Sequence, residues 1–293
     1  MASDFVPPSL PQENKLRTFT YHSQPELSSS EPVAIGVDEA GRGPVLGPMV
    51  YAVAYAPLSY LPELAQHGYN DSKVLVAEVR QKHFQDLIQS SKKDQIGWAT
   101  TVMTALDIGE GMLRPDLPYN LNDQAHDTTI ELIQRVLMSG VNVAELYVDT
   151  VGPPDKYQRK LAARFPSISK VVVTKKADSI YPIVSLASIC AKVTRDLSLE
   201  DQLTDNPGSG YPSDPNTVSW LREHMDKMFG WGPLVRYSWS TATKMLDTEG
   251  YKVVWKSDID EGNTKKNLLL YGPPKKYKGL PMIGMSMYGE PAK

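Results

Sequence analysis

Four acidic residues stand at or just after the ends of apolar runs, where β-strands would leave a sheet. Asp38 and Glu39 end the first run, Asp149 ends a second, and Asp178 follows a third by a few residues. In open α/β sheets, side chains at the carboxyl ends of strands form the ligand site. Carboxylates brought close together repel unless cations neutralise them, and hard cations such as Mg²⁺ prefer oxygen ligands. Each acid alone is an ordinary strand-end residue, but the set predicts phosphodiester hydrolysis with two ions about 4 Å apart.

A glycine-rich loop follows the first acidic pair directly. Its residues Gly41, Arg42 and Gly43 precede further Gly and Pro residues that extend to Pro48. Glycines let a backbone approach a ligand closely, and the planar guanidinium of Arg42 suits a phosphate. A lone Gly-Arg-Gly is usually only a turn, whereas the whole segment with its acids is a specific pattern.

Residues 156–176 form a basic stretch without any acidic residue. Its charged members are Lys156, Arg159, Lys160, Arg164, Lys170, Lys175 and Lys176. The simplest interpretation is a solvated helix face together with strand ends. The stretch becomes a candidate for phosphate binding only beside a nuclease-like site. The net charge of −3 does not exclude nucleic acid, because binding depends on the local field.

The hydrophobic pattern predicts the elements that position these residues. Apolar runs predict strands at residues 32–37, 49–56, 95–103, 146–149 and 171–174. Apolar residues at helical intervals predict helices at residues 74–90, 123–138, 155–165, 182–197, 217–228 and 240–247. Because strands alternate with helices, we expect an α/β fold, and the opening hairpin makes its sheet mixed.

Composition limits the class of protein. Of the 293 residues, 41% are hydrophobic and 22% are charged, so the chain is globular. A single cysteine, Cys190, excludes a disulfide framework and a Cys-rich zinc site, and its place on an apolar helix stripe makes it a core residue. No apolar run reaches the ~20 residues that span a bilayer, so we expect a soluble intracellular protein with no membrane partner.

Several segments resemble the type 2 ribonuclease H family, the ribonuclease HII group. The motifs occur in the family's order between residues 33 and 245, with no catalytic position missing. They lie at residues 38–49, 71–73, 147–152, 176–178, 185–196 and 208–212. Residues 120–122 and the long C-terminal part resemble the catalytic subunit of the eukaryotic type.

The resemblance implies a ribonuclease H-like mixed sheet flanked by helices, with a helical C-terminal extension. It implies a metal-dependent endoribonuclease that hydrolyses RNA in RNA–DNA hybrids and incises 5′ of ribonucleotides embedded in DNA. The products would carry 5′-phosphate and 3′-hydroxyl ends, and the roles would be removal of misincorporated ribonucleotides and of replication primers. Asp38, Glu39, Asp149 and Asp178 would be catalytic and would hold two Mg²⁺ ions, with Mn²⁺ as the alternative.

The resemblance also implies residues that bind substrate. Gly41, Arg42 and Gly43 would read the ribose 2′-hydroxyl, largely through backbone groups, because that hydroxyl distinguishes RNA from DNA. Tyr211 would stack on the sugar of the deoxynucleotide after the ribonucleotide; the alternative is a turn tyrosine packed on the domain.

Three further residues are weaker candidates for contacts to substrate phosphates. They are Ser72, Lys73 and Arg195. For Arg195, a salt bridge with Asp196 or Glu200 is the structural alternative. Asn120, in a loop before a helix, has a turn role as its simplest interpretation.

The expected organisation has four parts. Residues 1–31 would be a disordered leader, 32–200 the catalytic domain, 201–250 a helical part that completes the substrate site, and 251–293 a tail. By resemblance, the chain would work in the nucleus in a heterotrimer with two accessory subunits. The apolar segments 268–270 and 282–287 would help to dock them, unless they pack on the chain's own domain.

Two other functions fit part of the pattern. The first is a catalytically silent scaffold that binds hybrids, which the intact acidic set disfavours because binding alone needs no carboxylates beside phosphates. The second is a resolvase-like two-metal nuclease. Such an enzyme acts on DNA only and has no reason to sense a 2′-hydroxyl, so the Gly-Arg-Gly loop and Tyr211 disfavour it.

Overall fold

The computed structural model describes residues 5–11, 13–67, 69, 76–89, 95–115, 117–150, 152–203 and 205–252. The chain divides into one unit of Met1–Gly250 and a second of Tyr251–Lys293. Of the second unit, the structure describes only Tyr251 and Lys252. No helix of the described residues has both the length and the apolar character needed to cross a membrane.

The first unit is built on a six-stranded mixed sheet with the strand order β1-β4-β3-β2-β5-β6. The strands are β1 (Phe19–His22), β2 (Val33–Ala40), β3 (Met49–Pro57), β4 (Gly97–Met103), β5 (Val143–Asp149) and β6 (Lys170–Thr174). β2 and β3 form the expected antiparallel hairpin, in register from Val33 opposite Pro57 to Ala40 opposite Val50. β5 is parallel to both β2 and β6, so the prediction of a mixed sheet is confirmed.

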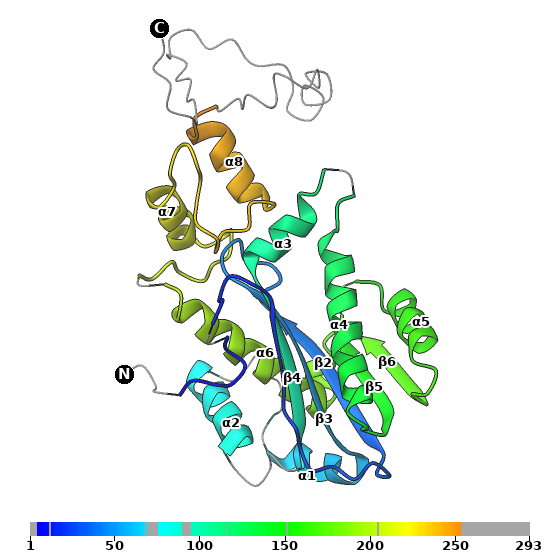
Figure 1. The fold of residues 1–293 in the computed structure, drawn as a ribbon. Coiled ribbons are helices and arrows are strands. Elements are labelled where there is room, and N and C mark those ends of the chain that lie inside the picture. The colour runs from blue at the N-terminus through cyan, green and yellow to red at the C-terminus, as the bar shows by residue number, and fades with distance from the viewer. Residues whose placement is uncertain are drawn as a thin grey trace, which may run out of the picture. The chain divides into compact units, whose positions relative to one another are not determined.

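Helices cover both faces of the sheet, with α2 and α6 on one side and α4 and α5 on the other (Figure 1). The helices are α1 (Leu61–Leu64), α2 (Ala77–Gln89), α3 (Ala105–Met112), α4 (Leu121–Met138), α5 (Pro154–Arg164), α6 (Pro182–Glu200), α7 (Pro215–Glu223) and α8 (Ser240–Glu249). Because strand side chains alternate between faces, Val33, Ile35 and Val37 pack in the α4–α5 core, whereas Ala34 packs in the α6 core.

α6 lies directly on β2 because Gly36 has no side chain. A Cβ at Gly36 would be 2.4 Å from the carbonyl oxygen of Ile183, closer than atoms can approach. This contact brings the middle of α6 over the carboxyl end of β2. A third apolar core, which contains Leu221, Trp231 and Met245, joins α7 and α8 to the loop after β2.

The expected disordered leader is wrong for two segments. Residues Phe19–His22 form β1, which pairs with β4, and Ser9 and Leu10 are buried. The alternating Thr and aromatic residues at 18–21 favour a strand. By pairing there, they satisfy backbone groups of β4 that an edge strand leaves open.

Two other differences concern helices. The helix predicted over 217–228 ends at Glu223, because the Asp226 carboxylate accepts hydrogen bonds from the N–H groups of Met228 and Phe229 and forms a turn. α3 was not expected, and it begins where the Thr104 side chain accepts a hydrogen bond from the Asp107 N–H.

Candidate active site

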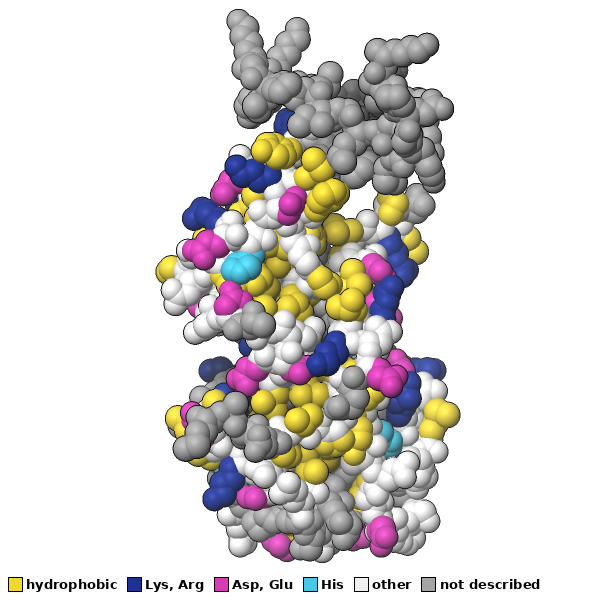
Figure 2. All heavy atoms as spheres, turned by 60° about the vertical axis from the view of Figure 1, so that its left-hand side comes forward, with side chains coloured by type: hydrophobic (Ala, Val, Ile, Leu, Met, Phe, Trp, Pro, Cys, Tyr) yellow, Lys and Arg dark blue, Asp and Glu magenta, His cyan; other side chains and the backbone are white. Residues whose placement is uncertain are grey.

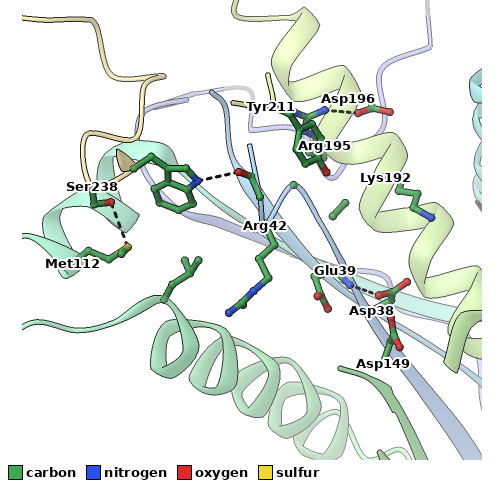
Figure 3. A pocket seen from close by; sticks show the side chains of 15 residues that line it. Asp38, Glu39, Arg42, Met112, Asp149, Lys192, Arg195, Asp196, Tyr211 and Ser238 are labelled. Atoms are coloured by element: carbon green, nitrogen blue, oxygen red, sulfur yellow. Dashed lines mark hydrogen bonds and ion pairs between the residues drawn. The ribbon is translucent and has the colours of Figure 1, made fainter. Parts of the chain in front are cut away.

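Three of the four strand-end acids line one cavity of about 880 Å³ at the carboxyl edge of the sheet. Asp38 and Glu39 come from β2 and Asp149 from β5, which are parallel neighbours whose carboxyl ends share this edge. Figure 3 shows Asp38 and Asp149 close together, beneath Lys192 of α6. The register of the sheet therefore brings together residues that lie far apart in the sequence.

Asp38 is the most buried acid that lines this cavity. Burial, together with the Asp149 charge, raises the pKa of its carboxyl group to about 7, while a hydrogen bond from Ser188 and the Lys192 charge oppose the shift. The Glu39 N–H also donates to Asp38 Oδ1 at 2.8 Å. The raised pKa shows that the protein's own groups compensate this carboxylate only in part.

Asp178 lies beside the cavity without lining it. It is buried in a short 3₁₀ turn, Ala177–Ser179, that follows β6. The Ala177 N–H donates to Asp149 Oδ1 at 3.0 Å, which ties this turn to the end of β5. In the described part of the chain, no three His, Cys, Asp or Glu side chains form a ready metal-binding group.

The donor set nevertheless suits a hard divalent cation. Asp38, Glu39 and Asp149 offer only carboxylate oxygens, which are the ligands such ions prefer. A cation beside Asp38 and Asp149 would relieve the repulsion and burial that raise the Asp38 pKa.

The Gly-Arg-Gly loop forms another wall of the cavity. Gly41 has φ +74°, and a Cβ there would be 2.6 Å from the carbonyl oxygen of Pro48, so only glycine fits. A Cβ at Gly43 would be 3.0 Å from the ring of Tyr211, which lies against this glycine and is 45% exposed. Arg42 extends toward α4, where its Nη2 donates to Asn122 Oδ1.

A buried arginine from the C-terminal part holds this loop. Arg236 is fully buried, and its Nε, Nη1 and Nη2 donate to the carbonyl oxygens of Gly47, Arg42 and Gly41 at 2.9, 3.1 and 2.6 Å. Trp239 Nε1 donates to the Gly43 carbonyl oxygen at 2.9 Å, and the Arg236 guanidinium lies 4.7 Å from the Trp239 ring centre. The fork of Arg236 thus fixes the path of the loop backbone.

Sequence reasoning missed Arg236 and Asn122 as site residues. Nothing near Arg236 in the sequence forms a motif, so a single sequence carries no signal for it. Asn122 lies in the family-like stretch 120–122, and the Ser188 and Lys192 that face Asp38 lie in the stretch 185–196. Those stretches were the available signal.

The remaining expectations have mixed outcomes. Arg195 lines the cavity, but its Nη1 also lies 3.0 Å from Asp196 Oδ1, so the structural ion pair is present. Ser72 and Lys73 lie outside the described residues. Asn120 caps α4 by accepting from the backbone N–H groups of residues 122 and 123, and Cys190 is buried in the core, as predicted.

Burial of Asp38 makes the stability of the metal-free protein depend on pH. Its pKa rises from an ordinary value of 3.8 to about 7, so the folded state binds more protons than the unfolded state between these pH values. The stabilisation is complete below about pH 4 and is lost as pH rises through about 7. In EDTA, we expect the melting temperature of the wild type to fall relative to that of Asp38→Asn between pH 5 and 8. Identical pH profiles for the two proteins would contradict this prediction.

Comparison with known proteins agrees with the fold and the site. The family model described as Ribonuclease HII matches residues 35–242. A ribonuclease H2 subunit from Schizosaccharomyces pombe is 50% identical over 270 residues, which cover 87% of this chain and 82% of that protein. The Homo sapiens protein of the same name is 46% identical over 246 residues, covering 81% of this chain and 80% of that protein.

The crystal structure of ribonuclease H2 from Pyrococcus horikoshii OT3 superposes with a TM-score of 0.62 at 34% identity, covering 73% of this chain and 97% of that one. The fold and its acidic strand edge are therefore those of a hydrolase of the ribonuclease H class. The chain belongs to the ribonuclease HII family, as a catalytic endoribonuclease subunit of the eukaryotic type.

Proposed function

We propose that the chain hydrolyses RNA in RNA–DNA hybrids and incises 5′ of ribonucleotides embedded in duplex DNA, leaving 5′-phosphate and 3′-hydroxyl ends. The observation that supports this most is the single cavity in which acids for hydrolysis adjoin a loop and a tyrosine suited to a ribose. Removal of misincorporated ribonucleotides and of replication primers follows as its cellular role.

Within this proposal, Asp38, Glu39 and Asp149 hold two Mg²⁺ ions, with Mn²⁺ as the alternative and Asp178 completing the set. When bound, such ions activate a water and stabilise the leaving oxygen. The Glu39 N–H and Ser188 donate to the Asp38 carboxylate and orient it. Lys192 of α6 lines the same cavity and adds a positive charge near the phosphate.

The Gly-Arg-Gly loop is proposed to sense the 2′-hydroxyl through its backbone. A backbone reader must be rigid, because a loop that adapts would accept a deoxyribose equally well. Arg236 and Trp239 supply that rigidity by binding the carbonyl groups of Gly41, Arg42 and Gly43. This arrangement disfavours a nuclease that acts on DNA alone.

Tyr211 is proposed to stack on the sugar after the ribonucleotide. We expect Tyr211→Ala to lower cleavage of a duplex with one ribonucleotide about 10-fold, since an aromatic stack contributes about 1–3 kcal/mol. Cleavage of a continuous hybrid falls much less, and Tyr211→Phe retains the preference for the junction. Steady-state cleavage of both substrates measures the ratio, and an equal loss on both would assign Tyr211 to packing only.

The decisive test of the function is cleavage of a duplex DNA that carries one ribonucleotide, with Mg²⁺ and an all-DNA control. Incision 5′ of the ribonucleotide, absent from the control, is the expected result. Tight binding of hybrids without incision, even in the assembled complex, would instead indicate the silent scaffold.

The relatives from Schizosaccharomyces pombe and Homo sapiens are named as subunits, which supports assembly into a larger complex. We propose a nuclear heterotrimer in which two accessory subunits dock on the C-terminal tail. The apolar segments 268–270 and 282–287 assigned to this role lie outside the described residues.

A further inference from the structure

The basic stretch 156–176 separates into two groups in the fold. α5 returns across the sheet from the end of β5 to the start of β6, so its two ends lie at opposite edges. Arg164 ends α5 and donates to Gln134, and Lys170 begins β6 and lies 3.5 Å from the Glu145 carboxylate. This pair belongs to the edge away from the acids.

The other group lies at the edge that holds the acids. Thr174 ends β6 directly opposite Asp149, so Lys175 and Lys176 continue the chain beside that acid. Lys156 and Arg159 occupy the first turns of α5, which begins a few residues after Asp149. All four basic side chains are exposed, and together we name them the basic rim.

Contacts between α5 and β6 hold the two halves of the basic rim together. Gln158 Oε1 accepts a hydrogen bond from the Val173 N–H at 3.0 Å, while Tyr157 and Leu161 are buried beneath α5. Lys156 and Arg159 therefore project outward as neighbours three residues apart on the helix. Lys160 is not part of the rim, because it lies 3.8 Å from Asp127.

The basic rim differs in charge pattern from another face of the molecule. Its only exposed acid between residues 154 and 176 is Asp155, against four basic side chains. On the face where α2 and α7 lie, acidic and basic side chains are interspersed with apolar ones (Figure 2). A chain with net charge −3 thus concentrates positive charge beside its acidic cavity.

We propose that the basic rim binds the phosphate backbone of the substrate duplex beyond the cleavage site, on the β6 side of the cavity. The inference rests on the proposed function for the identity of the duplex. Exposed Lys and Arg side chains release counterions when they neutralise phosphates, so the rim contributes affinity that weakens with salt. Phosphate contacts position the duplex without reading its bases or sugars. The rim therefore serves hybrids and all-DNA duplexes alike.

The test uses the full-length chain and the double variant Lys156→Gln/Lys175→Gln. Lys176 is left unchanged, because its φ of 58° makes the backbone there sensitive to substitution. Binding of an uncleaved all-DNA duplex is measured in Mg²⁺ across a series of KCl concentrations. We expect the slope of log affinity against log salt to decrease in magnitude by about 1.8, or about 0.9 for each lost contact.

The matched control is Arg164→Gln/Lys170→Gln, which removes the same charge from the same stretch at the opposite edge. Its slope should equal that of the wild type; an equal decrease in both variants, or no decrease in the rim variant, would overturn the proposal. On the duplex with one ribonucleotide, the rim variant should show a several-fold higher KM and an unchanged kcat. Failure of the proposed function would appear separately, as absence of incision by the wild type.

Discussion

Asp38→Asn is expected to lower kcat on the order of 10³-fold while the protein remains folded. The substitution removes a negative charge that would bind the cation, and charge stabilisation at such sites is a large part of catalysis. An Asn oxygen can still accept the hydrogen bonds from the Glu39 N–H and Ser188 that Asp38 accepts. Single-turnover cleavage of a duplex with one ribonucleotide measures the loss.

The fold of Asp38→Asn should not be weakened in the absence of metal. The neutral side chain removes a buried charge that Asp149 repels, so the melting temperature in EDTA near pH 8 should equal or exceed that of the wild type. Asp155→Asn removes an exposed acid at the start of α5 and serves as the control with wild-type turnover. Turnover close to wild type in Asp38→Asn would show that the site assignment is wrong.

Arg236→Gln is expected to cost about 3–5 kcal/mol of unfolding free energy, because it breaks a buried charged network. Three backbone carbonyl groups of the Gly41–Gly47 segment lose their donors at once. Arg236→Lys keeps the charge but lacks the planar fork, so it should be intermediate. Urea unfolding of the three proteins measures the order.

A positional role for Arg236 predicts an effect that lost stability alone does not produce. At temperatures where the variant is folded, a displaced loop should reduce the ratio of cleavage between substrates with a 2′-hydroxyl and with a 2′-fluoro group at the target. Arg222→Gln in α7, which breaks an exposed ion pair with Glu249, is the control with an unchanged ratio. A folded Arg236→Gln protein with wild-type discrimination would contradict the role.

Local sequence patterns were sufficient to predict most of the sheet and its helices. Gly97–Met103 and Pro182–Glu200 have a periodicity that neighbouring residues alone specify, and both form the expected element. The leader was the exception, since four residues form a strand only when β4 offers them a partner. Likewise, the turn at Asp226 depends on one side-chain hydrogen-bond acceptor that hydrophobic periodicity does not register.

For the site, the sequence alone determined the chemical groups: strand-end acids, a loop that requires glycine, and a basic stretch. Their types follow from short motifs, and those motifs carry the resemblance to a family. Only the tertiary structure decided which of them share a cavity. It placed Asp38 beside Asp149 through the parallel pairing of β2 and β5, and it left Asp178 behind the cavity wall.

The tertiary structure also decided the role of Arg236 and the division of the basic stretch between two sheet edges. Arg236 lies nearly two hundred residues from the carbonyl groups it binds, so no local pattern relates them. The physical reason is general to the site. Side-chain chemistry is a property of single residues, whereas burial, electrostatic repulsion and hydrogen-bond partners arise only when packing brings distant segments together.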